Sequence, residues 1–333
     1  YKAKYAANVT VRSDASSRFG KDNRTAVFVS GGLSWNIARE YFMRPVTWLS
    51  DLKLKVSVGS TGNAAVGNYG HLALAGTADY NGTTGWGYAQ LPNPDLGWEK
   101  QIQTNVGISA TFFEKLKVDV NLYHRKTKDM LMSTPLPYTT GFSSMMNNVG
   151  EMSNRGVEIE ASYDIIRNKD VYFSLRGNYT YNKNKVDKLF YDLDEWPMKS
   201  SLLCLKKGES LNFYMPIFAG IDKEDGAPMW YKVGYKGEPG YTFNPETMTK
   251  DEAQIENLYQ DTGKSYYAPH HGGFGFTFSW KGLSIVADFS YVLGKYMVNN
   301  AYFLSTASST AKQGFNMDRD ALDMWRNPGD ETY

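Results

Sequence analysis

Two groups of residues in this 333-residue chain have side chains that could bind a metal. His270 and His271 are adjacent, and adjacent residues of a strand point to opposite faces, so the two imidazoles cannot easily share one ion. The segment from Asp222 to Gly226 weakly resembles a calcium loop, but Gly234 lies near the position where a bidentate Glu is required. We therefore expect a turn at 222–226 and no metal site.

The single cysteine, Cys204, is not expected to act as a catalytic nucleophile. One cysteine excludes an intrachain disulfide, and no base is positioned in the sequence to activate the thiol. We expect neither a catalytic residue nor a cofactor.

Aromatic side chains in three long polar segments are the candidates for ligand contact. Aromatic faces bind the apolar faces of sugars and of peptide side chains in wet clefts. The same side chains could instead pack between loops or contact a protein that covers them. The candidates are Tyr80, Trp86 and Tyr88 in the first segment, Tyr138 and Phe142 in the second, and Tyr191 and Trp196 in the third.

The elements that carry these segments alternate apolar and polar residues with a period of two. Between Gln101 and Phe113, Val106 and Ile108 fall on one face and Asn105 and Ser109 on the other. This period predicts β-strands with one apolar and one polar face. Similar stretches lie at 5–12, 27–35, 52–59, 118–123, 157–164, 171–176, 274–280 and 285–291, and two more strands are expected within 211–233, which gives about eleven.

The connections between these stretches alternate between long and short, as an antiparallel up-and-down transmembrane β-barrel requires. Across eleven strands the alternation holds only if the turn at 222–228 is a periplasmic hairpin. A soluble β-sandwich or propeller is the alternative. Strands of about ten residues favour the barrel, as do aromatic residues near the short turns, namely Trp35, Phe42, Trp48, Phe112, Phe113 and Trp280.

The barrel interpretation assigns each strand residue to lipid or to the lumen. We predict that one face, which contacts lipid, holds Val106, Ile108, Val118, Val120, Leu122, Val157 and Ile159. The lumen face then holds Asn105, Ser109, Asp119, Asn121, Glu158 and Glu160.

Charge and composition argue against a nucleic-acid-binding protein and against a helical membrane protein. The net charge of +1 gives no basic field for nucleic acid. The sequence has no run of eighteen apolar residues, and it therefore predicts no transmembrane helix. No signal peptide is visible at Tyr1, and the chain stops at Tyr333 without a terminal strand, so we expect an internal fragment of a longer protein.

Several short motifs, in order along the chain, resemble the barrel of SusC/RagA-type TonB-dependent transporters of Bacteroidetes outer membranes. The most specific is Asn93-Pro94-Asp95-Leu96-Gly97-Trp98-Glu99, which enters a strand. The loop 13–24 is similar to a family loop but has Ala15 where Gly is usual. The other matches are 54–63, 123–131 (with Arg125 in place of a Lys), 148–158, Gly272-Gly273-Phe274 and 325–330.

This resemblance implies a 22-stranded barrel closed around an N-terminal plug, of which residues 1–333 form a partial barrel domain without the plug. It also implies import of oligosaccharides or oligopeptides, a SusD-like surface lipoprotein that covers the barrel, and energy from the TonB complex. A non-transporting outer-membrane protein, such as an adhesin or assembly factor, is the alternative, and an outer-membrane enzyme is disfavoured because no catalytic constellation is present.

Overall fold

The fold is almost entirely β-structure in the computed structural model, which describes residues 2–237, 240, 242–306, 314, 316–323, 325 and 327–328. The chain forms two compact units. The barrel unit comprises Tyr1–Asp194, Lys207–Ser210 and Ala268–Gly294. The loop unit comprises Glu195–Lys206, Leu211–Tyr267 and Lys295–Tyr333. Among the described residues, no helix is long and apolar enough to cross a membrane.

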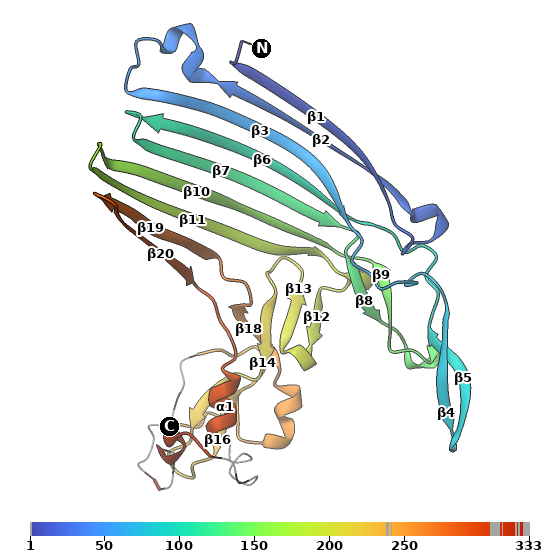
Figure 1. The fold of residues 1–333 in the computed structure, drawn as a ribbon. Helices are drawn as coiled ribbons and strands as arrows, with labels where there is room; N and C mark the ends of the chain where they lie inside the picture. Colours follow the sequence, from blue (N-terminus) through green and yellow to red (C-terminus); the bar gives the residue numbers. More distant parts are fainter. Residues whose placement is uncertain are drawn as a thin grey trace. The chain divides into compact units, whose positions relative to one another are not determined.

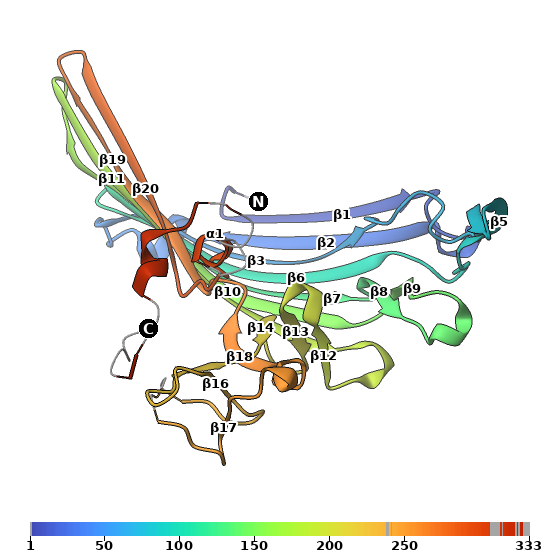
Figure 2. The ribbon, with the colours of Figure 1, turned by 90° about the horizontal axis from the view of Figure 1, so that it is seen from below.

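A single antiparallel sheet of nine strands forms the barrel unit, and its strands neighbour one another in chain order (Figures 1 and 2). Each strand has between 11 and 18 residues, which is enough to cross a bilayer when tilted. The sheet is open, with β1 and β20 at its edges. The strands are β1 (Tyr5–Ala15), β2 (Thr25–Asn36), β3 (Leu49–Asn63), β6 (Glu99–Phe112), β7 (Leu116–Lys128), β10 (Glu151–Arg167), β11 (Val171–Lys188), β19 (His270–Trp280) and β20 (Leu283–Leu293).

The connections of this sheet separate into two kinds at its two ends. At one end, here called the turn end, the connections are 37–48, 113–115, 168–170 and 281–282. At the other, the loop end, they are 16–24, 64–98, 129–150 and 189–269. Two loop-end connections contain hairpins, β4 (Leu74–Tyr80) with β5 (Thr83–Gln90), and β8 (Leu131–Pro135) with β9 (Ser144–Asn148). The predicted alternation of long and short connections is therefore confirmed for the last three pairs of connections. In the first pair, the turn-end connection 37–48, with twelve residues, is longer than the loop-end connection 16–24, with nine.

The expectation that 211–233 contributes two membrane-crossing strands is wrong. The strands found there are β14 (Asn212–Met215), β15 (Phe218–Ile221) and β16 (Pro228–Tyr231), each of four residues. They are too short to cross a bilayer. β15 and β16 do form an antiparallel pair across the expected turn.

Apolar residues of this hairpin are buried in a small separate core. This burial explains why the segment 211–233 has the alternating pattern expected of membrane-crossing strands. Ala219 and Met229 are fully buried and pack with Tyr231 and Met248. The alternation of apolar and polar residues in this hairpin thus reflects burial in a core of the loop unit and not contact with lipid. The long segment 189–269 is a single loop-end connection, so the nine described strands of the sheet do not need the expected periplasmic hairpin at 222–228.

Small sheets make up the loop unit. One has the strand order β12 (Glu195–Met198), β13 (Leu203–Lys206), β14 and β18 (Gln260–Ser265). The other joins β15, β16 and the two-residue β17 (Met248–Thr249). The described part of this unit also includes the short helix α1 (Asn300–Thr306).

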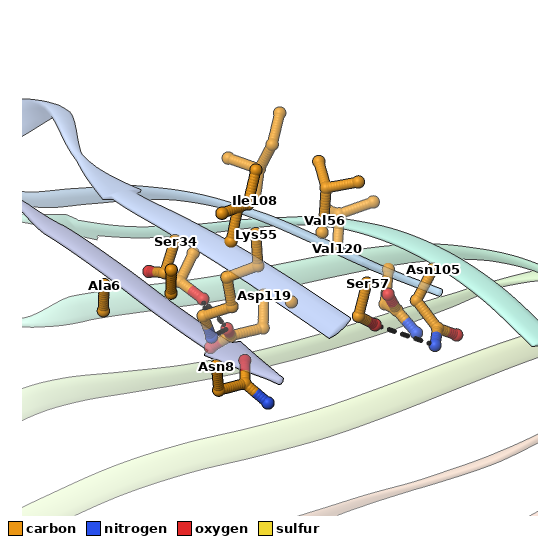
Figure 3. Close-up of a pocket in the computed structure, with 16 residues that line it drawn as sticks. Ala6, Asn8, Ser34, Lys55, Val56, Ser57, Asn105, Ile108, Asp119 and Val120 are labelled. Atoms are coloured by element: carbon orange, nitrogen blue, oxygen red, sulfur yellow. Dashed lines mark hydrogen bonds and ion pairs between the residues drawn. The ribbon is translucent and has the colours of Figure 1, made fainter. Parts of the chain in front are cut away.

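The nine-stranded sheet has one apolar and one polar face, as predicted. The strand register places Val106 beside Leu122, and Leu122 beside Val157. These side chains do not form a dry core, because 54% of Leu122 and 40% of Val106 are exposed. Figure 3 shows Val56, Ile108 and Val120 on one side of the sheet and Lys55, Ser57 and Asn105 on the other.

Hydrogen bonds link the polar side chains along the opposite face. Lys55 Nζ donates to Ser109 Oγ at 2.7 Å, and Ser109 Oγ donates to Asp119. Asn121 Nδ2 donates to Glu158 Oε2 at 3.1 Å. The two predicted sets of residues therefore lie on opposite faces.

Aromatic side chains mark the turn end on the apolar face. Trp48 stacks on Phe112 with 5.9 Å between ring centroids, and Tyr5 stacks on Trp35 at 6.5 Å. Amphipathic rings at one height across several strands are typical of the interfacial girdle of a membrane barrel.

We predict that replacing Val120 by Arg destabilises the intact barrel in lipid by about 2–4 kcal/mol, because a charge then faces hydrocarbon. The matched change Asn121→Arg faces the polar side beside Glu158 and should cost much less. Unfolding free energies in lipid vesicles measure both, and equal values would contradict the assignment of the faces.

Candidate functional site

A small buried core ties the loop-end connections together. Leu96 and Phe19 are fully buried and pack with Val66, which is 7% exposed. Leu131 and Met146 from the connection 129–150 pack against them. This loop-base core thus joins three connections, 16–24, 64–98 and 129–150, that are distant in sequence.

Two asparagine side chains fasten the same connections by hydrogen bonds. Asn93 Nδ2 donates to the Met146 carbonyl at 2.7 Å and to Asn147 Oδ1 at 2.8 Å. Asn148 Oδ1 accepts from the Gly97 amide at 2.6 Å, while its Nδ2 donates to the Gly97 carbonyl at 2.8 Å. Asn148 therefore pairs with both backbone groups of one residue, as a neighbouring strand would.

Trp98 and Gly20 complete the attachment to the first connection. The Trp98 indole packs on Phe19 and Phe28, with centroid distances of 5.3 and 5.8 Å, and its Nε1 donates to the Arg24 carbonyl at 2.9 Å. A Cβ on Gly20 would lie 2.5 Å from the Pro94 carbonyl oxygen. Only glycine therefore allows this close approach of two backbones.

The motif 93–99 thus has a structural role that the sequence reasoning missed, since it treated the motif only as a family signature. A usable signal was present, because an apolar Leu-Gly-Trp group within a long polar loop indicates local burial. The motif fixes the bases of these connections.

The candidate aromatic residues lie on the outer parts of these connections. Trp86 and Tyr88 are 80% and 75% exposed and, two residues apart on β5, share one face of the β4–β5 hairpin. Tyr80 belongs to β4, but its side chain lies outside the described part of the structure. In the second connection Tyr138 is 94% exposed, whereas Phe142 is half-buried.

The third group of candidates is divided between the two units. Tyr191 is in the barrel unit, and its hydroxyl donates to the Pro135 carbonyl of β8 at 3.4 Å. The structure thereby brings Tyr191 to the connection that carries Tyr138. Trp196 is half-buried in β12 of the loop unit.

The polar face of the sheet carries paired charges. Arg176 donates to Asp288 Oδ1 through Nε at 2.9 Å and Nη2 at 2.6 Å, and these residues border a hollow of about 320 Å³. Lys55 lies 3.8 Å from Asp119. Such a surface offers hydrogen-bond donors and acceptors to a hydrated ligand.

The predicted turn at 222–226 is confirmed. Asp222 Oδ1 accepts from the Glu224 amide at 2.8 Å, and Asp225 Oδ1 accepts from the Ala227 amide at 3.0 Å. Lys250 Nζ lies 2.8 Å from Asp222 Oδ2 and 3.0 Å from Asp225 Oδ2. The hydrogen bond from Lys250, with that from the Glu224 amide, lowers the pKa of Asp222. An ammonium group therefore balances these carboxylates.

The thiol of Cys204 and the imidazole of His270 are the two other candidate groups for chemistry. Cys204 is fully buried in the loop unit, and this burial, together with the charges of Glu195 and Asp261, raises the pKa of its thiol to about 12. The thiol is protonated at neutral pH. His270 Nδ1 hydrogen-bonds the Tyr179 hydroxyl at 2.7 Å. In the described ranges, no group of three or more His, Cys, Asp or Glu side chains could hold a metal.

Comparison with known proteins identifies the family of this sheet. Residues 1–203 match the model of the TonB dependent receptor-like β-barrel. The chain belongs to this family. The SusC/RagA resemblance predicted from the motifs is thereby confirmed, and the relatives are receptors and transporters rather than enzymes.

Three relatives show how much of a transporter this chain represents. TonB-dependent receptor P39 of Formosa agariphila is 30% identical over 100% of this chain and 35% of its own length. TonB-dependent receptor SusC of Bacteroides thetaiotaomicron is 30% identical over 78% of this chain and 25% of its own. The structure of the RagAB peptide transporter superposes with a TM-score of 0.87 at 36% identity, covering 99% of this chain and 36% of that chain. The chain thus spans about a third of the length of the relatives that it matches most fully.

Family membership orients the sheet. Barrels of this family lie in the outer membrane, so the apolar face contacts lipid and the polar face lines the lumen. Long connections of such barrels are extracellular and short ones periplasmic. The loop-base core therefore lies at the extracellular end.

We predict that Asn148→Ala loosens the loop end but leaves the barrel folded. Loss of the paired hydrogen bonds to Gly97 should cost about 1–3 kcal/mol locally. Hydrogen exchange should accelerate in both 93–98 and 129–150, whereas Tyr138→Ala, which removes a side chain that is 94% exposed, should change neither. Unchanged protection in Asn148→Ala would contradict the role of this side chain.

Proposed function

We propose that residues 1–333 form part of the barrel domain of an outer-membrane transporter that imports oligopeptides or oligosaccharides. A SusD-like surface lipoprotein covers the barrel, and the TonB complex supplies energy through a plug domain outside this segment. The polar lumen face below a joined group of extracellular loops is the observation that carries the proposal. The 36% identity to a peptide transporter over 99% of the chain supports it.

The physical argument for a covering partner comes from the loops. Import requires that cargo be enclosed before a plug moves, because cargo in an open barrel returns to the medium. The loop-end connections expose large aromatic side chains, among them Trp86, Tyr88 and Tyr138, and the first two share one face of the β4–β5 hairpin. We assign these residues, with Tyr80, Phe142, Tyr191 and Trp196, to contact with cargo or with the lipoprotein.

We predict that the intact transporter, solubilised from outer membranes and purified by an affinity tag, carries a surface lipoprotein with it. Uptake of fluorescent peptide or oligosaccharide mixtures should fall when the neighbouring lipoprotein gene is deleted. Purification without any lipoprotein, together with normal uptake in the deletion strain, would refute the covered mechanism.

We also predict that the double change Trp86→Ala/Tyr88→Ala weakens either cargo uptake or lipoprotein capture. Each lost aromatic contact should cost about 1 kcal/mol, or roughly fivefold in the half-saturating concentration or in lipoprotein affinity. The control is Tyr41→Ala, an equally exposed aromatic residue at the turn end. If the double variant matches this control in both assays, these two residues have no role in binding.

A further inference from the structure

A cluster of basic side chains lies on the lipid-facing side of the sheet at its loop end. It lies on β6, β7, β10 and β11, and we call it the basic patch. The residues that share this face and this height are Lys100, His124, Lys126, Lys128, Arg155, Lys183, Lys185 and Lys188.

The strand register shows that these side chains form lateral rows. Arg155 lies beside His124 of β7 and beside Lys183 of β11. Neighbouring strands are about 4.8 Å apart, so this row places three basic groups within about 10 Å. The next row toward the loop end holds Lys126 and Lys185 on either side of Ser153.

The patch begins where the apolar band ends. Arg155 is two residues from Val157, and Val157 lies between Leu122 and Tyr181 in the adjacent row. Two residues of a strand span about 6.6 Å, and both side chains point to the same face. The basic groups therefore lie at the height of the headgroups of the outer leaflet, with Tyr181 at the boundary.

Part of the patch is neutralised and part is not. Lys126 pairs with Glu151 at 2.7 Å, and Lys100, Lys185 and Lys188 lie 3.5–3.8 Å from Asp129, Asp187 and Asp192. His124, Lys128, Arg155 and Lys183 are exposed and have no ion pair within the described ranges. The patch therefore retains a net positive charge.

Neighbouring surfaces lack this charge, so the patch is specific to one place. On the lumen face, the row that includes Arg125 continues with the neutral side chains Gln103, Asn154 and Asn184. On the lipid face at the turn end, the strands finish in apolar or aromatic residues such as Phe112 and Leu116.

We propose that the basic patch binds the phosphorylated headgroup of an outer-leaflet lipid. Arg and Lys donate charge-assisted hydrogen bonds to phosphate oxygens. Their alkyl stems cover apolar surface while their charged ends reach the headgroup region. Basic clusters beside a membrane-spanning surface attract anionic lipids. A site on the outer wall at this height is in contact with lipid, whereas cargo enters through the lumen.

The test uses the intact transporter in detergent and native mass spectrometry. The probes are phosphorylated lipid A and the same lipid after enzymatic removal of its phosphates. We expect the phosphorylated form to bind more tightly and the double variant Arg155→Gln/Lys183→Gln to lose roughly fivefold affinity per charge, about 25-fold in total. The control Lys115→Gln/Lys117→Gln removes the same charge at the turn end and should retain wild-type affinity.

Four results would overturn the proposal. These are equal binding of the two lipids, unchanged binding in the patch variant, an equal loss in the control variant, and competition by millimolar inorganic phosphate as effective as that by lipid. The last would indicate a site for free phosphate. Heat-modifiable migration on gels shows that each variant barrel is folded, and cargo uptake should be unaffected, which separates this site from the transport proposed above.

Discussion

The structure depends on one constraint, which is that a backbone inside a lipid bilayer has no water to satisfy its amide and carbonyl groups. Each strand must therefore pair with neighbours, and the seven strands between the edge strands β1 and β20 have an antiparallel partner on both sides. Pairing at this length fixes the side-chain alternation, because a slip of one residue would turn every Val and Ile of a strand into the lumen. The two-faced sheet, the opposed sets around Val120 and Asn121, and the separation of long from short connections all follow from this requirement.

Outside the bilayer, different interactions stabilise the chain. At the loop end, water is available, and order comes from local burial and from side chains that satisfy backbone groups. Leu96 and Phe19 supply the burial, while Asn93 and Asn148 replace missing strand partners. This base holds the connections in place while side chains such as Trp86 and Tyr138 stay exposed, as their proposed role in recognition requires.

The two ends of the sheet differ in the chemistry of their lipid-facing boundary. Stacked pairs such as Trp48 with Phe112 mark the turn end, whereas Arg155, Lys183 and their neighbours mark the loop end. Aromatic rings suit any interface between apolar and polar layers, but cations suit an interface that carries anionic groups. The difference thus matches a membrane whose two leaflets are chemically distinct.

The sequence by itself determined the fold class, the faces of the strands and the order of the connections, because period-two alternation is a local property that pairing preserves. It also carried the family motifs, whose matches run from 13–24 to 325–330. Only the tertiary structure decided that 211–233 stays outside the barrel, since short strands such as β15 and β16 alternate in the same way when they bury Ala219 and Met229 in a separate core. The pairing of Asn148 with Gly97 and the lateral grouping of Arg155 with Lys183 were also invisible in the sequence. The first depends on contact between two connections. The second depends on the register between strands whose residues lie tens of positions apart, which is set by pairing rather than by any single strand.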